Sequence, residues 1–306
     1  MDMRIIEDIK AKYRDYRLGK MDRMARALNA REGRITSAPT SPGVTLPNKL
    51  KIELKTLLKQ LSIAKDAEKA IASIDENPAQ PKVSADGVFL KGFEAYAHSL
   101  GIAKIGYTEI PREYIFNGRS VAYTHAIVLI MEIPRMPIDA APGPATQAIG
   151  IVTYQQMGDT TNRLTDYLRE RGYGAEAGHP AIGPALYPPL AIKAGLGNGG
   201  RHGLFITPEF GPRQRISAIF TSIGNLPVTD STEHAWMRDF CTSCGNCVRR
   251  CPGKAIYETP IKHADGRLSH IDGDKCISCT LCMKECTYNK LGYAKIKEVY
   301  IKKAVT

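Results

Sequence analysis

The pattern of hydrophobic and polar positions changes several times along the chain and predicts both helices and strands. Residues 160–172 ("TTNRLTDYLRERG") form a predicted helix, and residues 188–194 ("PPLAIKA") also show helical spacing of their apolar side chains. Two β-like runs follow, "LFIT" at 204–207 and "RISAIFTSI" at 215–223. The sequence between these elements is rich in glycine, so we expect a sheet to hold a glycine-rich loop.

The most apolar run of the chain is too short to cross a membrane. It spans residues 126–131 ("AIVLIM") and ends in Glu132, whereas a membrane-spanning helix needs about 18 or more apolar residues in a row. The N-terminal residues contain early acidic side chains and no apolar core, which argues against a secretory or twin-arginine signal. We therefore expect no membrane span and a cytoplasmic location.

Length and composition predict two domains with additional terminal segments. With 306 residues and 43% hydrophobic content, the chain can form one full-sized core and a smaller module. Helical segments are expected around residues 4–17 and 49–59, separated by a linker at 36–47. The predicted organisation is an N-terminal helical segment and linker (1–80), a cofactor and substrate domain (81–237), an iron–sulfur domain (238–292) and a basic tail (293–306).

The eight cysteines form two runs with the same spacing, C-x2-C-x2-C-x3-C, which is that of bacterial ferredoxins. In this pattern three thiolates of one run hold a 4Fe-4S cluster, and the fourth crosses to the other cluster. Structural zinc and disulfides are weaker alternatives, because zinc needs no third close thiolate and cytosolic disulfides are rare. The predicted ligand sets are Cys241, Cys244, Cys247 and Cys286 for one cluster, and Cys276, Cys279, Cys282 and Cys251 for the other.

The segment between the two cysteine runs predicts a β-hairpin. Residues 255–275 read as a strand, a turn at Asp265 and Gly266, and a second strand. Pro252 follows the first run as the ferredoxin pattern requires, whereas Thr287 replaces the second proline. Since a turn residue is lost there and no ligand is, a dicluster module is still expected.

The string "AGLGNGGRHGLFITPEFGPR" at 194–213 contains six glycines. Gly195, Gly197 and Gly200 spell G-x-G-x-x-G, but the dinucleotide fingerprint needs a strand before it, a helix after it and an acid further on. Here helical spacing precedes the glycines and a β-like run follows them. The remaining interpretations are a tight connection or a loop whose backbone closely approaches a bulky ligand, with Arg201 and His202 projecting from it.

The string at 179–227 ("HPAIGPALYPPLAIKAGLGNGGRHGLFITPEFGPRQRISAIFTSIGNLP"), followed by the dicluster module, resembles the corrinoid-dependent reductive dehalogenases and, more loosely, the epoxyqueuosine reductases. The resemblance extends upstream through residues 161–177 and more faintly to 92–111. It implies an α/β (α+β) fold in which a nitroreductase-like layer binds cobalamin, followed by a bacterial ferredoxin-like domain. Two 4Fe-4S clusters would then pass low-potential electrons to the corrinoid. A flavin in the same place is the alternative cofactor.

The resemblance also implies roles for individual side chains. Arg201 stands where the family places a cation that stabilises the proton donor or the leaving anion, and this role is electrostatic because a guanidinium keeps its charge. The proton donor is either Tyr154 or Asp159, and Tyr154 is preferred because a neutral phenol can donate at pH 7. Asp159 would lie at the head of the helix 160–172, where it could also cap that helix. The predicted cofactor contacts are Gly195, Gly197, Gly200, Arg201, His202 and Pro208.

The leading hypothesis is a soluble corrinoid-dependent oxidoreductase that reductively removes a leaving group from a small organic substrate. Its electrons would come from a low-potential donor such as a ferredoxin or flavodoxin. The first alternative is an enzyme acting on a modified tRNA base, for which the net charge of +11 and the basic termini would supply phosphate contacts. The second alternative is an electron-transfer or corrinoid-reducing protein without its own substrate.

Overall fold

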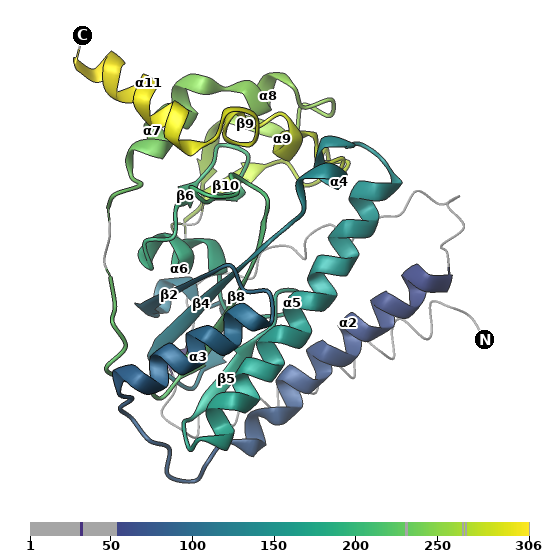
Figure 1. Cartoon of the computed structure of the whole chain (residues 1–306). Helices are drawn as coiled ribbons and strands as arrows, with labels where there is room; N and C mark the ends of the chain where they lie inside the picture. Colours follow the sequence, from purple (N-terminus) through teal and green to yellow (C-terminus); the bar gives the residue numbers. More distant parts are fainter. Residues whose placement is uncertain (1–30, 33–53, 230–231, 265, 267, 306) are drawn as a thin grey trace.

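A four-stranded antiparallel sheet lies at the centre of the protein (Figure 1). The structure is a computed structural model that describes residues 31–32, 54–229, 232–264, 266 and 268–305. The strand order is β2 (Lys104–Glu109), β4 (His125–Glu132), β8 (Gln214–Thr221) and β5 (Ala175–Gly178). In β4 the run of apolar residues is buried from Ala126 to Met131, as expected for a central strand covered on both faces.

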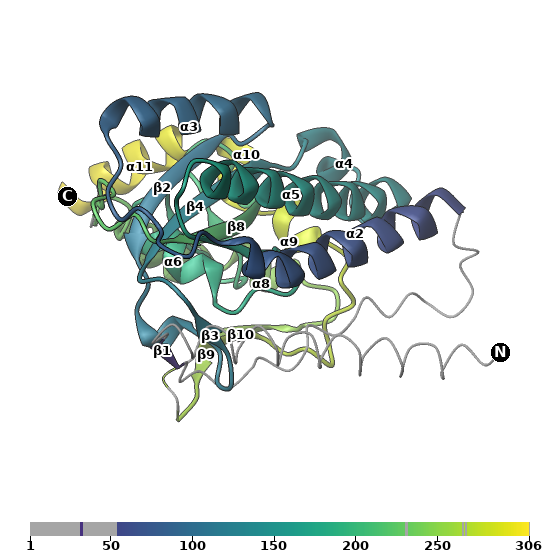
Figure 2. The ribbon, with the colours of Figure 1, turned by 90° about the horizontal axis from the view of Figure 1, so that it is seen from below.

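Helices cover both faces of this sheet (Figure 2). The elements before the cysteine runs are α2 (Leu54–Ala72), η1 (Ser73–Glu76), α3 (Gly87–Ser99), η2 (Arg112–Tyr114), α4 (Arg135–Asp139), α5 (Pro144–Glu170) and α6 (Tyr187–Lys193). The additional short strands are β1 (Arg31–Glu32), which pairs with β3 (Ser120–Val121), and β6 (Asn198–Gly199), which pairs with β7 (Phe205–Ile206).

Alternation along the strands divides the core into two clusters. Ile127, Leu129 and Ile219 pack with α3 and α5 on one face of the sheet. Val128 and Phe220 point to the opposite face and pack with α6. Successive strand residues point to opposite faces, so these neighbouring positions separate the two layers. The α6 layer is the one that continues into the glycine-rich loop.

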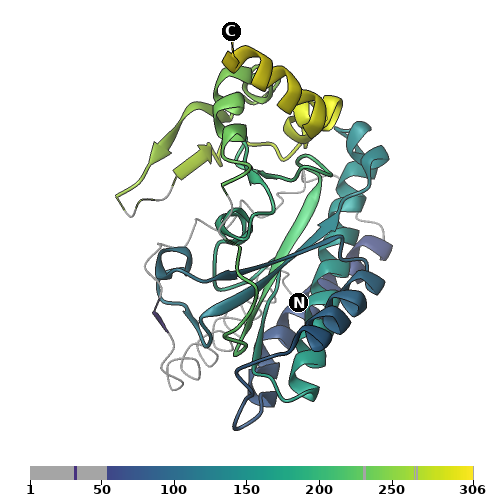
Figure 3. The same cartoon turned by 60° about the vertical axis from the view of Figure 1, so that its left-hand side comes forward.

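The cysteine-bearing segment packs at one end of the sheet (Figures 1 and 3). It consists of α7 (Trp236–Cys244), α8 (Asn246–Arg249), β9 (Ile256–Lys262), β10 (Leu268–Ile271), α9 (Leu281–Lys284), α10 (Thr287–Leu291) and α11 (Tyr293–Val305). Its apolar contact with the core includes Ile206 of β7, which clusters with Met237, Cys286 and Tyr288. The β9–β10 hairpin projects on the side of the molecule that carries α6 (Figure 3).

The mixed helix-and-sheet class predicted from the sequence is confirmed, as are several of its elements. The helix expected at 188–194 is α6, the β-like runs contain β7 and β8, and the strand-turn-strand pattern between the cysteine runs is the β9–β10 hairpin. Gly266 has a φ of 83° in the turn of this hairpin, a conformation that glycine adopts without a side-chain clash.

The position expected for Asp159 is wrong. The helix begins at Pro144, so Asp159 lies in the interior of α5, where its carboxylate is 3.8 Å from Arg163 one turn later. It therefore cannot cap this helix. The helix can begin as early as Pro144, because the missing backbone N–H of proline is tolerated in the first turn. The residues between Pro144 and Asp159 are therefore helical as well.

Several other predictions are tested only in part. The helix expected around 49–59 overlaps α2, which the structure describes from Leu54 to Ala72. The helix expected at 4–17 and the linker at 36–47 lie outside the described residues. Among the described residues, no helix combines the length and the apolar character that crossing a lipid bilayer requires. The cytoplasmic location stays a prediction.

Candidate cluster and cofactor site

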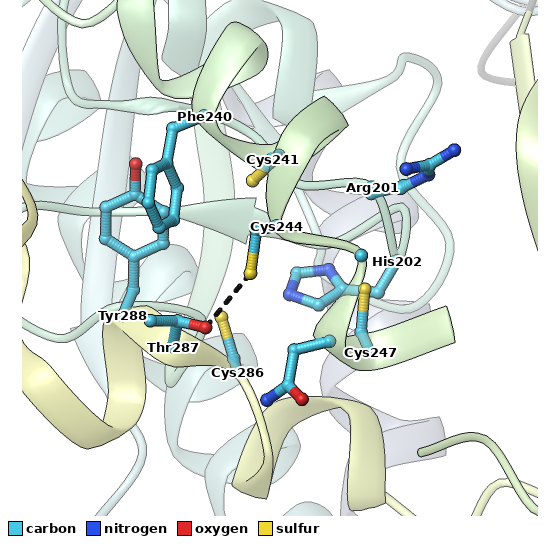
Figure 4. Close-up of a pocket in the computed structure, with 11 residues that line it drawn as sticks. Arg201, His202, Phe240, Cys241, Cys244, Cys247, Cys286, Thr287 and Tyr288 are labelled. Atoms are coloured by element: carbon cyan, nitrogen blue, oxygen red, sulfur yellow. Dashed lines mark hydrogen bonds between the residues drawn. The ribbon is translucent and has the colours of Figure 1, made fainter. Parts of the chain in front are cut away.

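Three cysteines of the first run and one of the second line one small cavity (Figure 4). Cys241 and Cys244 lie on α7, Cys247 lies on α8, and Cys286 comes directly before α10. All are free thiols, and the aromatic rings of Phe240 and Tyr288 form another part of the cavity wall. The structure thus brings together the four residues that the spacing assigned to one cluster.

The second run repeats the backbone shape of the first. Gly245 follows the second cysteine of its run with a φ of 57°, and Thr280 occupies the same place in the other run with a φ of 63°. A single-turn helix follows each of them, α8 and α9. Thr280 adopts a conformation that is rare for β-branched residues. The shared turn indicates that both runs wrap around the same kind of group.

The second set of cysteines also converges. The pKa of Cys282 is raised to about 12 by burial, and negative charge on Cys279 and Cys276 adds to the effect. The chain after Cys251 packs against the chain before Cys276, since a Cβ on Gly253 would lie 2.4 Å from the carbonyl oxygen of Lys275. The segment that follows Cys251 therefore lies against the start of the second run, and the assignment of Cys251 to the second cluster stays a prediction.

The cavity of the first set has the properties of a cluster site. Burial raises the pKa of Cys241 to about 12 and also raises the pKa of Cys247, because an apolar site disfavours a bare thiolate. Iron would supply the positive charge that such thiolates need. Among the described residues no three His, Cys, Asp or Glu side chains close around one metal ion. Each thiolate of a 4Fe-4S cluster binds a different iron, so the four thiols need only surround a cluster-sized space.

The glycine-rich loop is held as a narrow two-stranded ribbon beside this cavity. Gly199 pairs with Phe205 across β6 and β7, and the amide of Gly200 donates to Leu204 O at 2.8 Å. Gly197 has a φ of 152°, and a Cβ there would lie 2.0 Å from the carbonyl oxygen of Ile206. Only glycine fits at position 197, because the backbone of Ile206 lies too close for a side chain. This close approach holds the tip of the loop against α7.

Arg201 and His202 stand at the tip of this ribbon and both line the cysteine cavity. The guanidinium of Arg201 donates to the carbonyl oxygen of Thr242 at 2.8 Å, and its backbone amide hydrogen-bonds with Cys241. His202 is buried, and its Nδ1 accepts from the Leu204 amide at 3.1 Å. The loop therefore contacts the cysteine helix through side chain and backbone together.

A second, much larger cavity of about 750 Å³ opens on the other side of the ribbon. Ligand pockets are usually about 300–1,000 Å³. Arg201 and Cys241 line both cavities, so a group in the large cavity would lie next to the cysteine site. The rest of the wall comes from η2, α6, the ribbon, α7 and the β9–β10 hairpin, and it includes Glu113, Tyr114, Pro188, Ile192, Gly199, Gly200, Gly203, Arg238, Glu258 and His270.

The sequence-predicted site residues divide between these places. Gly200 and Arg201 line the large cavity, and His202 lines the cysteine cavity. Gly195, Gly197 and Pro208 are absent from both walls. Gly195 follows the end of α6, where its amide donates to Ile192 O, and Pro208 lies in the turn that Thr207 and Gly211 close.

The two predicted proton donors lie elsewhere. Tyr154 is on α5, where the guanidinium of Arg215 stacks 3.8 Å from the centre of its ring. Arg215 also donates to Thr153 Oγ1, so its side chain points to the α5 face of the sheet. The large cavity is bounded by α6, on the opposite face. Neither Tyr154 nor Asp159 belongs to its wall, and the assignment of the donor stays a prediction.

Sequence reasoning missed several residues of the large cavity. Gly199 and Gly203 belong to the predicted glycine loop, so a closer reading of that loop could have included them. Tyr114 and the hairpin residues Glu258 and His270 carry no local signal, because only the packing of distant segments brings them to the same wall.

Comparison with known proteins relates the chain to an iron–sulfur domain family and to two kinds of reductase. Residues 240–290 match the family model of the 4Fe-4S dicluster domain. Over 185 residues the chain is 30% identical to a tetrachloroethene reductive dehalogenase of Desulfitobacterium hafniense, a match that covers 54% of this chain and 33% of that protein. The chain is related to the reductive dehalogenases. It spans about a third of the length of this relative.

Two further comparisons show how far the similarity extends. The epoxyqueuosine reductase of Francisella cf. novicida is 32% identical over 124 residues, which cover 40% of this chain and 29% of that protein. A solved reductive dehalogenase, described as suggesting a mechanism for B12-dependent dehalogenation, superposes with a TM-score of 0.58 at 19% identity, covering 78% of this chain and 39% of that one. The fold is therefore shared with the reductive dehalogenases, and the suspected resemblance is confirmed. By name, both relatives are reductive enzymes.

Proposed function

We propose that this chain binds two 4Fe-4S clusters and a corrinoid, and reductively removes a leaving group from a small organic substrate. The observation that carries the proposal is the pair of adjoining cavities, which share Arg201 and Cys241. One cavity offers four thiols, and the other has the size and the glycine-lined wall that a flat, bulky cofactor needs. The relationship to the reductive dehalogenases supports the same reading.

The cysteines hold the two clusters in series. Cys241, Cys244, Cys247 and Cys286 would bind the cluster beside the large cavity, and Cys276, Cys279, Cys282 and Cys251 the second one. All four cysteines of the second set are partly exposed, whereas Cys247 and Cys286 of the first set are buried. Electrons from a low-potential donor such as a ferredoxin or flavodoxin would enter there and pass inward, because Cys282 lies close enough to Cys247 for their charges to interact.

The ribbon and α6 would position the corrinoid. Gly199, Gly200 and Gly203 present backbone without side chains to the large cavity, so a flat ring can approach closely. When bound, a corrinoid supplies a cobalt centre that accepts low-potential electrons and serves to break the bond to the leaving group. The positive charge of Arg201, fixed by its bond to Thr242, stabilises an anion that leaves the substrate.

The proton donor is tested by comparing two tyrosines. Tyr154 is the predicted donor, and Tyr114 is a phenol that lies in the wall of the large cavity. If Tyr154 donates, Tyr154→Phe lowers kcat by about 10²–10⁴-fold, whereas Tyr114→Phe changes it little. The reverse result would move the donor to Tyr114. The corrinoid content of each variant, measured in the absence of substrate, controls for loss of the cofactor.

The cofactor proposal is tested by anaerobic reconstitution with iron, sulfide and hydroxocobalamin, followed by gel filtration and a visible spectrum of the protein peak. We expect about one corrinoid per chain. A Gly199→Leu variant should retain its iron and lose the corrinoid, because a Cβ at 199 meets only Ile192, 3.9 Å away, and the longer side chain enters the cavity. Gly87→Leu, at a position with open space around its Cβ, is the matched control. Full iron content without corrinoid in the unmodified protein would overturn the proposal.

The epoxyqueuosine reductase relationship is the second candidate function, and it covers a smaller part of the chain than the dehalogenase match. Binding of unmodified tRNA that weakens steeply with salt would favour it, since each phosphate contact releases counterions. Turnover of a halogenated substrate without tRNA binding would favour the dehalogenase activity.

A further inference from the structure

His202 is the most deeply buried polar side chain of the cysteine cavity, with 1% of its surface exposed. It comes from the β6–β7 ribbon and not from either cysteine run. In Figure 4 its imidazole ring lies between Cys244 and Cys247. A residue from the cofactor-binding layer thus reaches into the cluster site.

The hydrogen bond from Leu204 fixes which ring nitrogen of His202 carries the proton. The Leu204 amide lies 3.1 Å from Nδ1, and a backbone N–H can only donate. Nδ1 must therefore be the acceptor, and the neutral ring carries its hydrogen on Nε2. A charged ring could not accept this bond, so the geometry itself requires the neutral form.

The Nε2–H group has no partner among the described protein atoms, although it is fully buried. Leaving such a donor unsatisfied costs about 1–3 kcal/mol. Two polar groups of the same cavity wall are already paired: Thr287 contacts Cys244 Sγ at 3.1 Å, and the side-chain amide of Asn246 donates to Glu285 O. The hydroxyl of Tyr288 also lacks a partner, but it points away from the four sulfur atoms (Figure 4). His202 is therefore the donor directed at the space among the thiols.

We propose that His202 donates a hydrogen bond from Nε2 to a sulfur of the cluster held by Cys241, Cys244, Cys247 and Cys286, and so raises the reduction potential of that cluster. The proposal rests on the proposed function, because it requires the cluster. Hydrogen bonds to the sulfurs are among the factors that set such potentials. A donor favours the reduced cluster, which carries one more negative charge. His202 acts here as a positioning and tuning residue of the loop that also forms the wall of the large cavity.

Two variants separate the hydrogen bond from the packing. In His202→Asn the amide oxygen replaces Nδ1 as acceptor for the Leu204 amide, but no donor reaches the place of Nε2. In His202→Gln the longer side chain carries an N–H to that place. His98→Asn is the control, because His98 lies on α3, away from the cysteines, and its ring bonds to the carbonyl oxygen of Ile102.

The measurement is an anaerobic redox titration of the reconstituted protein, followed by electron paramagnetic resonance, together with iron and sulfide content. We expect His202→Asn to lower the ratio of reduced to oxidised cluster at a fixed potential at least tenfold, about 59 mV for one electron. His202→Gln should restore most of the ratio, and His98→Asn should leave it unchanged. An unchanged ratio in His202→Asn at full iron content would overturn the proposal.

A second readout does not depend on the folding of a variant. In protein labelled with ¹⁵N-histidine, the reduced cluster should show a nitrogen coupling in pulsed spectra of the unmodified protein, and its absence would overturn the inference. Low iron and sulfide content in the unmodified protein would instead refute the proposed function, so the two failures are distinguishable.

Discussion

The buried side chain of Arg213 joins the sheet to the cysteine-bearing segment, and its removal should weaken that junction more than an exposed arginine would. Its Nε donates to Asn289 Oδ1 at 2.8 Å, and its Nη1 donates to Ile133 O at 2.8 Å and to Glu132 at 2.7 Å. Only 9% of the Arg213 side chain is exposed, compared with 44% of Glu132. Asn289 lies on α10, three residues after the cluster cysteine Cys286.

The size of the effect follows from which partners water can reach. In Arg213→Met, Glu132 is rehydrated, whereas the oxygens of Asn289 and Ile133 stay buried without their donor. Each of these two groups costs about 1–3 kcal/mol, so the free energy of unfolding should fall by roughly 2–6 kcal/mol. Arg135→Met is the control, since Arg135 forms an exposed pair with Asp139 that is worth at most about 1 kcal/mol.

The assay is anaerobic urea unfolding of the reconstituted protein, monitored by far-ultraviolet circular dichroism and by the visible absorbance of the clusters. We expect the Arg213→Met midpoint to shift by both probes. In a double-mutant cycle with Asn289→Leu, the coupling energy should exceed about 0.5 kcal/mol, as for residues in one network. A loss below 1 kcal/mol, or strict additivity in the cycle, would refute this account of the junction.

Three further outcomes can be checked by equilibrium unfolding. Burial lowers the pKa of His179 from 6.5 to about 4, so below pH 6.5 the unfolded state binds more protons than the folded state. The stabilisation from neutral His179 is therefore complete above pH 6.5 and decreases by up to about 3 kcal/mol towards pH 4. His179→Asn should lose this pH dependence, and a variant that keeps it would contradict the reasoning. Gly197→Ala should cost more than about 3 kcal/mol or prevent folding, since its Cβ would overlap Ile206 O; a near-neutral result contradicts the ribbon geometry. Thr280→Gly should gain about 1 kcal/mol by relieving a left-handed backbone, as Gly245 already does in the first run, and a loss of stability would argue against that strain.

The cysteine sets could be predicted because their spacing is local, and the crossing of the fourth ligand is a property of that spacing. The grouping of Cys286 with the first run follows from the pattern although the two lie far apart in sequence. The wall of the large cavity could not be predicted in the same way. It depends on how the hairpin, α6 and η2 pack together, and nothing in the local sequence of Glu258 or Tyr114 indicates that contact.

The true length of α5 was hidden by its composition. Threonine has a low helix propensity, and several threonines lie in this helix. In the part of α5 that the sequence did not predict, the Thr153 hydroxyl donates to the carbonyl oxygen of Ile149 one turn earlier, at 2.8 Å. The same hydroxyl accepts from Nε of Arg215 on β8 at 3.0 Å. Tertiary contact with the sheet therefore stabilises the early part of α5, whereas helix propensity alone would begin the helix later in the sequence.

The ribbon formed by β6 and β7 separates two cavities that share part of its wall, and this limits how the sequence can change. Its tip contributes Arg201 to both cavities and His202 to the thiols, while its base is held by the close approach of Gly197 to Ile206. Adding or deleting one residue in the ribbon would shift its contacts with both cavities at once. Insertions that enlarge the large cavity should therefore accumulate in the β9–β10 turn or in the segment around η2, and the ribbon should keep its length.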